Sequence, residues 1–270
     1  MDKEMHTATN YYLFNLAVSD LIVTLTLFLG ALDSFEYGHW SCKVNIFFTL
    51  VLWNNSVLTI TVLSVERYVA IWYPLRQKSL SVWRRVLKII TGIWIMAVVV
   101  TIPDIWSVNI VKTSHSLFCS IVPTPVARVI NGVMGIVTFA VPLMIMTVVY
   151  IMIAIKVNVA QSSKSGSKVF NHRDDGRRVN KLVIALTLSF ILCWLPYFVI
   201  RILIFALEIY QLLALVKWWS LLQRLMILNS SFSLVLNPIL FSLISTKFKE
   251  SLMKLWATKI KRRKIIITIV

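Results

Sequence analysis

Glu66 and Arg67 stand side by side at the point where a long apolar run of this 270-residue chain ends. A carboxylate beside a guanidinium can form an ion pair, and the guanidinium can also leave that carboxylate for another partner. Charges near the end of a membrane-spanning helix are a functional hypothesis by default. The alternative is a pair of long side chains that only marks the membrane interface. The chemistry suggested by this stretch is an exchange of partners by Arg67.

A second polar group is embedded in apolar sequence. Asp20 lies within "NLAVSDLIVTL", where a bare carboxylate costs about 2.5 kcal/mol or more in a bilayer. Ser56, Ser233 and Asn237 lie near the middle of other apolar runs, and their oxygens could join that carboxylate around a small cation such as sodium. A purely structural cluster of hydrogen bonds explains the same residues.

These residues need elements that hold them inside a membrane. Hydrophobic residues make up 58% of the chain and charged residues 14%, which is typical of a membrane protein. Six blocks reach the length of about 20 residues that a spanning helix needs: 11–32, 43–72, 87–106, 129–156, 179–207 and 216–243. Prolines that would kink helices interrupt four of them: Pro103, Pro142, Pro196 and Pro238. The predicted fold is an all-α membrane protein.

The net charge of +17 is distributed as a topology signal rather than as a nucleic-acid site. Lys and Arg number five in 73–88, seven in 156–181 and eight after Ser245. The intervening loops, 32–41, 107–127 and 208–217, contain only Lys112 and Lys217. By the positive-inside rule the basic loops are cytoplasmic. This places both termini and the Glu66–Arg67 pair on the inner side, with anionic lipids rather than nucleic acid as the general partner. No signal peptide is predicted, because the polar stretch 1–10 runs directly into a span.

The three cysteines divide by location. Cys42 falls at the outer end of a predicted span and Cys119 in an outer loop, where an oxidising compartment lets a disulfide persist. Cys193 lies inside the bilayer and is interpreted as a small packing residue. The glycosylation sequons that begin at Asn54 and Asn229 fall inside spans, so neither is expected to carry a glycan.

A series of motifs resembles those of the rhodopsin-like G-protein-coupled receptors, both in their order and in the helices on which they lie. The matching residues are "LAVSD" (16–20), Cys42, "ERY" (66–68), Trp94, Cys119, Pro142 with Tyr150, "CWLP" (193–196) and "NPILF" (237–241). Longer segments such as "LTITVLSVERYVAIWYPLR" (58–76) and "FILCWLPYFVIR" (190–201) are similar to the neuromedin U and ghrelin branch of peptide-hormone receptors.

The resemblance implies a seven-transmembrane receptor bundle, represented here by six spans that correspond to the family's helices 2 to 7. Residues 1–245 would form this bundle without its first helix, and 246–270 an amphipathic helix on the inner membrane surface with a basic tail. The chain is therefore expected to be a fragment or a truncated form. Phe241 stands where the family usually has tyrosine.

The resemblance also implies roles for individual residues. Glu66 would hold Arg67 at rest, and on activation Arg67 would turn toward Tyr150 and a G protein. Trp194, on the kink at Pro196, would shift under bound ligand. The remaining carried-over elements are Tyr68 of the "ERY" motif, the bend at Asn237 and Pro238, the position of Phe241, and a sodium pocket formed by Asp20, Ser56, Ser233 and Asn237.

The ligand site is expected at the outer ends of the helices. Arg201 matches an arginine of the family's "CWLP" segment and is the leading candidate for ligand contact. Other candidates at the same level are Arg128, Arg224, Asp104, Asp33, Glu36, Phe198, Trp218 and Trp219. For the two tryptophans, an aromatic belt at the membrane interface is the alternative.

The first hypothesis for function is a multi-pass plasma-membrane receptor for an extracellular neuropeptide or peptide hormone that signals to a heterotrimeric G protein. No cofactor is expected apart from a possible sodium ion at Asp20. A second hypothesis is a truncated, non-signalling form that associates with a full-length receptor, as a receptor dimer would. A transporter or channel would show sequence repeats and paired broken helices, and neither is seen in this sequence. An enzyme is not expected, because nucleophile elbows, metal-ligand spacings and phosphate-binding glycine loops are missing from the sequence.

Overall fold

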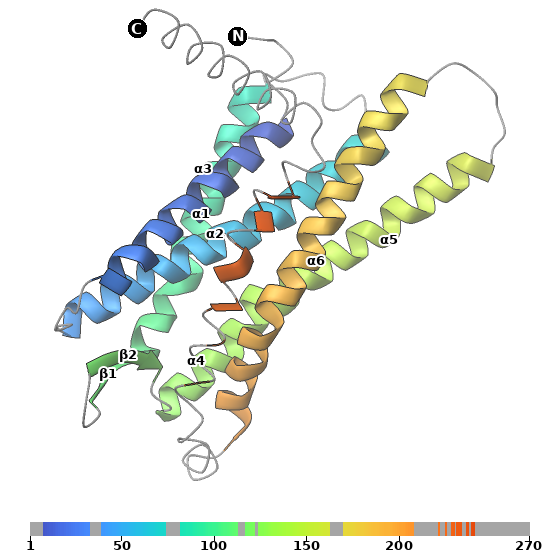
Figure 1. Ribbon diagram of the computed structural model, residues 1–270. Helices are drawn as coiled ribbons and strands as arrows, with labels where there is room; N and C mark the ends of the chain where they lie inside the picture. The colour runs from blue at the N-terminus through green and yellow to red at the C-terminus, as the bar shows by residue number, and fades with distance from the viewer. Residues whose placement is uncertain are drawn as a thin grey trace, which may run out of the picture.

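The helices of the computed structural model lie lengthwise beside one another, with one β-hairpin near one end (Figure 1). The structure describes residues 8–32, 39–73, 82–112, 117–121, 124–162 and 170–207, and separate residues between 221 and 240. The helices are α1 (Ala8–Leu32), α2 (His39–Trp72), α3 (Val82–Thr101), α4 (Pro125–Gly135), α5 (Val141–Ser162) and α6 (Phe170–Ala206). The strands are β1 (Val108–Lys112) and β2 (Leu117–Ile121).

The predicted spans are recovered as helices. Among the residues that the structure describes, four helical segments are long and apolar enough to cross a membrane: Trp40–Trp72, Val82–Ser107, Pro125–Lys156 and Ile184–Ala206. The predicted span 11–32 is the 25-residue helix α1. Of the predicted span 216–243, only separate residues are described, and residues 228–229, 231–233, 236–237 and 239–240 among them are helical. Apart from the short hairpin, the prediction of an all-α membrane fold is confirmed.

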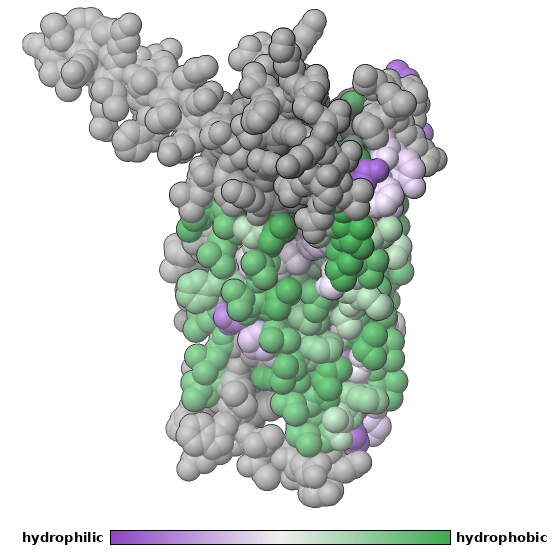
Figure 2. Space-filling view, turned by 90° about the vertical axis from the view of Figure 1, so that its right-hand side faces the viewer, coloured by the Kyte–Doolittle hydropathy of each residue, from purple (hydrophilic) through white to green (hydrophobic). Residues whose placement is uncertain are grey.

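Apolar side chains cover the outside of the helices, and polar ones gather inside. Figure 2 shows that hydrophobic residues predominate over the middle of the face in view. Exposed positions include large apolar residues such as Leu192 and Ile95, whereas Asp20, Asn55 and Asn131 are buried. Lipid can solvate the former, while the latter need protein partners. α2 is the central element, because it packs against α1, α3, α5 and α6.

Two of the predicted prolines lie beside changes of helix type. A π-helical turn, Ile136–Ala140, joins α4 to α5 just before Pro142, and the N–H of Val141 donates to the carbonyl of Ile136. The wider turn inserts one extra residue and so rotates the outer part of this helix relative to the inner part. A 3₁₀ turn, Ile102–Ser107, contains Pro103 and continues α3. Asp104 in this turn is buried.

The hairpin lies in the predicted outer loop 107–127 and was not predicted from the sequence. Its strands pair antiparallel, with Val108 opposite Ile121 and Lys112 opposite Leu117. α4 begins directly after it, where the Thr124 hydroxyl accepts a hydrogen bond from the Ala127 N–H at 3.1 Å and caps the helix. The hairpin thus marks the outer end of the molecule, opposite the end that bears Glu66 and Arg67.

Candidate functional site

Glu66 and Arg67 lie at the inner end of the helices, but Glu66 forms its ion pair with Arg85. The Glu66 carboxylate accepts a hydrogen bond from Arg85 Nη2 on α3 at 3.0 Å. The expectation that Glu66 holds Arg67 does not hold in this structure. Neighbouring residues of a helix point about 100° apart, so Glu66 faces α3 rather than the side chain that follows it. Within the described part of the chain, Arg67 Nε has no hydrogen-bond partner.

Tyr150 occupies the level just above Arg67. Its hydroxyl lies 2.9 Å from Ser64 Oγ on α2 and 2.8 Å from Thr187 Oγ1 on α6. Ser64 precedes Arg67 by three residues, so it lies about one turn from it on the same face of α2. Tyr150 therefore joins α2, α5 and α6 at the depth where the predicted switch would operate.

Tyr68 belongs to an aromatic group at the same end of α2. Its ring centroid lies 5.7 Å from that of Trp72. Lys156 of α5 places its Nζ 4.6 Å from the Trp72 ring centroid, a cation–π contact. This contact ties the inner ends of α2 and α5 together.

Asp20 lies in a buried polar cluster at mid-membrane, as predicted. Its Oδ2 accepts a hydrogen bond from Asn237 Nδ2 at 2.9 Å, and its Oδ1 accepts one from Ser56 Oγ at 3.3 Å. Asp20 and Asn237 are each 2% exposed, so they exchange solvent for these partners. Ser233, also buried, lies one turn before Asn237. The structure thus brings three of the four predicted residues into contact, and the fourth is buried one turn from Asn237.

The cluster continues along α1 toward the inner side. Asn15 donates to Thr59 Oγ1 at 2.8 Å, and its Oδ1 accepts from the Trp94 indole at 3.0 Å. Asn55 donates to Ser19 Oγ at 2.5 Å. These bonds connect α1, α2 and α3, so the structural cluster that was the alternative interpretation of Asp20 is present in the structure.

The donor set around Asp20 also fits a monovalent cation. The Asp20 carboxylate and the Ser56 hydroxyl beside it provide hard oxygen ligands, and the single negative charge matches a single positive one. Asp20 sits deep among apolar helices, where an uncompensated charge is expensive. The residues present are therefore compatible with the predicted sodium ion.

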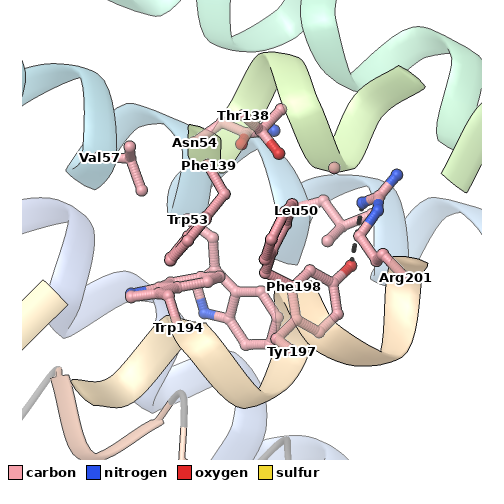
Figure 3. A pocket seen from close by; sticks show the side chains of 11 residues that line it. Leu50, Trp53, Asn54, Val57, Thr138, Phe139, Trp194, Tyr197, Phe198 and Arg201 are labelled. Atoms are coloured by element: carbon pink, nitrogen blue, oxygen red, sulfur yellow. Dashed lines mark hydrogen bonds between the residues drawn. The ribbon is translucent and has the colours of Figure 1, made fainter. Parts of the chain in front are cut away.

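Trp194 lies at the centre of an aromatic cluster that links α2 and α6. Its ring makes edge contacts with Trp53 at 4.9 Å and with Tyr197 at 6.0 Å between centroids. Phe190 lies 6.4 Å away on its inner side. Pro196 follows within the same helix. The predicted aromatic switch is thus packed on all these sides by other rings, as Figure 3 shows for Trp53 and Tyr197.

A pocket lies on the outer side of this cluster between α2, the π-helical turn and α6 (Figure 3). Phe198 and Phe139 line it as a stacked pair with centroids 4.6 Å apart. Trp53 also lines it, and its buried indole N–H has no hydrogen-bond partner in the described ranges. The pocket is therefore largely aromatic, with an unused hydrogen-bond donor in its wall.

Arg201 forms the outer wall of the pocket and is paired within the chain. Its Nη2 and Nη1 donate to the two carboxylate oxygens of Asp104 at 2.5 and 3.4 Å. It also donates to the Tyr197 hydroxyl at 3.1 Å and to the Asn131 carbonyl at 3.4 Å. Arg201 is 3% exposed and Asp104 4%. Two residues predicted to contact a ligand separately thus form one buried ion pair.

The other predicted outer residues are partly visible. Arg128 of α4 donates from Nη2 to the Phe205 carbonyl of α6 at 3.1 Å, which closes the outer ends of these helices. Cys42 is disulfide-bonded, as predicted, and the backbone of Cys119 lies in β2 opposite Ile110. The side chain of Cys119 lies outside the described part, so its pairing with Cys42 stays a prediction. Further predicted residues outside the described part are Asp33, Glu36, Trp218, Trp219, Arg224, Pro238, Phe241 and the tail 246–270.

Comparison of the sequence with known families identifies the family to which this polar core and outer pocket belong. Residues 1–241 match the family described as "7 transmembrane receptor (rhodopsin family)". The chain belongs to the rhodopsin family. It is accordingly a multi-pass protein of the plasma membrane, and its family is one of receptors rather than enzymes.

Several known receptors are relatives of this rhodopsin-family chain. The chain is 32% identical to neuromedin-U receptor 2 of Rattus norvegicus, a match that covers 92% of this chain and 66% of the relative. It is 30% identical to neuromedin-U receptor 1 of the same species, over 92% of this chain and 65% of the relative. It is also 30% identical to growth hormone secretagogue receptor type 1 of Oryctolagus cuniculus, over 94% and 73%. The chain thus spans just under two thirds of the length of the neuromedin-U receptors.

Four residues of this rhodopsin-family chain were missed by sequence reasoning. Arg85 was counted only as a topology charge, although it pairs with Glu66. Trp53 and Tyr197 were not singled out in the sequence, and their role follows from the rings around them. Asn229 was considered only as a sequon, but its amide bonds to α6. The signal that was available is polarity itself, because an amide within a span needs a protein partner.

Proposed function

We propose that this chain is the membrane-spanning part of a receptor for an extracellular peptide, and that it activates a heterotrimeric G protein at its inner face. The observation that carries the proposal is the continuity of α6. One helix presents Arg201 to the outer pocket, Trp194 to the pocket floor and Thr187 to Tyr150 near Arg67. A ligand that displaces the outer part of α6 therefore acts on residues that also set its inner position.

The outer pocket supports a peptide as the ligand class. Its walls combine stacked rings at Phe139 and Phe198, the buried indole N–H of Trp53 and the charged pair of Arg201 with Asp104. A peptide carries both apolar side chains and backbone donors and acceptors, so it complements such a mixed surface. The names of the relatives, receptors for neuromedin U and for a growth hormone secretagogue, point to the same class.

The inner end supports coupling to a protein partner. Arg67 is half-buried, and its Nε is unused among the described residues, while Glu66 is held by Arg85. The Arg67 guanidinium is therefore available to change partners when α6 moves away from α2. Such a change requires only that the G protein bind one of the two arrangements better than the other. Exposed Arg84 and Lys88 at this end suit anionic lipid headgroups.

A panel of peptides tests the proposal. Cells that display the receptor at their surface should respond to at least one peptide, with neuromedin U included, by calcium release or a change in cyclic AMP. The same cells without the receptor are the control, and the responding peptide should bind only to cells that display it. A receptor that reaches the surface and neither binds nor responds to any member would count against a peptide ligand.

We also propose that a sodium ion binds at Asp20 with the hydroxyls of Ser56 and Ser233, and that it favours the present arrangement. The ion would supply the positive charge that the buried carboxylate lacks. Purified receptor should then unfold at a higher temperature in NaCl than in KCl of equal ionic strength, because a ligand of the folded state stabilises it. Asp20→Asn, which keeps the shape of the side chain, should remove this difference. Equal melting of the unaltered receptor in both salts would contradict the proposal.

A further inference from the structure

The proline in α6 leaves one backbone carbonyl without its helical partner. In an α-helix the N–H of each residue donates to the carbonyl four residues earlier, and proline has no N–H. Pro196 therefore cannot donate to the carbonyl of Leu192. The carbonyl of Cys193, the next in the sequence, lies at the same kink. A carbonyl inside a membrane that finds no other donor costs free energy, so a partner from outside α6 is expected.

The side chain of Asn229 provides that partner. Its Nδ2 donates to the Leu192 carbonyl at 3.1 Å and to the Cys193 carbonyl at 2.8 Å. One amide nitrogen has two hydrogens, so both bonds can form at once. Asn229 lies in a helical part of the segment 221–240, far from α6 in sequence. Its amide is thus engaged by α6 rather than exposed for a glycan.

The two carbonyls are adjacent to the centre of the proposed switch. Cys193 is 3% exposed, and Trp194, which follows it, sits in the aromatic cluster. The amide of Asn229 therefore contacts α6 at the level where its direction changes. Hydrogen bonds from a second helix to these carbonyls help to set the direction of the part of α6 that follows Pro196.

We infer that Asn229 is a positioning residue that fastens the last described helical segment to the Pro196 kink, and that a change in the kink of α6 requires both of its hydrogen bonds to break. The assignment deepens the proposed function and rests on it, because it names the contact that moving α6 must give up. It does not depend on which ligand or G protein the receptor uses.

A double-mutant cycle tests this role. Asn229→Leu removes the two donors, and Pro196→Ala supplies the Leu192 carbonyl with a helical N–H that makes those donors unnecessary. The measurement is the rate at which N-ethylmaleimide modifies the buried Cys193 thiol in receptor-containing membranes, followed by mass spectrometry of the Cys193 peptide. Leu228→Ala, an exposed neighbour in the same segment, is the matched control and should leave the rate unchanged.

The two backgrounds should respond differently. With Pro196 present, Asn229→Leu should raise the modification rate by about tenfold, and in the Pro196→Ala background by less than about twofold, because the lost amide matters most where proline has left the Leu192 carbonyl without a helical donor. An Asn229→Leu variant that fails to fold only when Pro196 is present would also support the inference. An equal effect of Asn229→Leu in both backgrounds, or none in either, would overturn it. Since the assay uses neither peptide nor G protein, it can succeed or fail independently of the proposed function.

Discussion

Replacing Asp104 by leucine should lower the free energy of unfolding by about 3–5 kcal/mol, because it leaves the Arg201 guanidinium buried without its counter-ion. Arg201 is only 3% exposed, so water cannot replace the lost carboxylate without a rearrangement of the outer pocket. The hydrogen bonds to Tyr197 and to the Asn131 carbonyl would remain, but neither partner carries a charge. Thermal unfolding of purified receptor in detergent should show a midpoint lower by about 10 °C.

A matched double variant separates the charge from the packing. Asp104→Leu combined with Arg201→Met removes both charges while it keeps side chains of similar length, and buried ion pairs can often be replaced in this way at little cost. We expect the double variant to recover most of the lost stability. If it is as unstable as Asp104→Leu alone, packing around Asp104 rather than the ion pair determines the effect.

Replacing Arg67 by alanine should abolish peptide-stimulated nucleotide exchange on the G protein and leave peptide binding nearly unchanged. Arg67 lies at the inner end of α2, about 15 Å along the helix from Val57, the nearest residue of the pocket on α2, so its removal does not touch a ligand bound there. The neighbouring Glu66 carboxylate is engaged by Arg85, which leaves the Arg67 guanidinium able to contact the G protein. Binding of labelled peptide and GTPγS uptake in the same membranes measure the two properties separately. An Arg67→Ala receptor that still drives exchange would show that another residue makes the contact.

Replacing Arg85 should have a smaller effect on the same response. Arg85→Leu would release the Glu66 carboxylate, which could then turn toward Arg67 and retain it. We expect a loss of peptide-stimulated exchange of about fivefold, since a partly exposed ion pair is worth up to about 1 kcal/mol. Adding Glu66→Gln to Arg85→Leu should restore the response, because no carboxylate then remains to hold Arg67. A failure to restore it would mean that Arg85 acts through some other contact.

The ion pairs Glu66–Arg85 and Asp104–Arg201 show what could and could not be predicted from the sequence. Sequence reasoning placed Glu66 and Arg67 near one end of the helices and Asp104 and Arg201 near the other, because position along a helix follows from the number of residues. It paired Glu66 with Arg67, which the structure does not show, and it proposed no ion pair between Asp104 and Arg201. The Glu66 carboxylate is taken by Arg85, and the Arg201 guanidinium by Asp104. A partner depends on the direction in which a side chain points and on the neighbouring helix that it meets there.

Direction is sensitive to small irregularities that hydropathy does not reveal. A single residue added to a turn rotates everything beyond it by about 100°. The π-helical turn Ile136–Ala140 adds such a residue between the outer and inner parts of its span, and so decides which side chains of α4 face α6. One consequence is the close contact of the two helices at Gly132, where a Cβ would lie 2.6 Å from the Phe205 ring. Pro142 indicated an irregularity there but not its type.

The sequence alone indicated a membrane protein and the positions of its apolar helices, because these follow from composition and from the length of apolar runs, and its motifs indicated the family. The buried cluster around Asp20 was also within reach, since a carboxylate in lipid must find polar partners and few were available. Only the tertiary structure decided which groups meet: Arg201 with Asp104, Glu66 with Arg85, and Asn229 with the carbonyls at the Pro196 kink. Those contacts depend on how the helices are rotated and kinked against one another, which no single helix specifies.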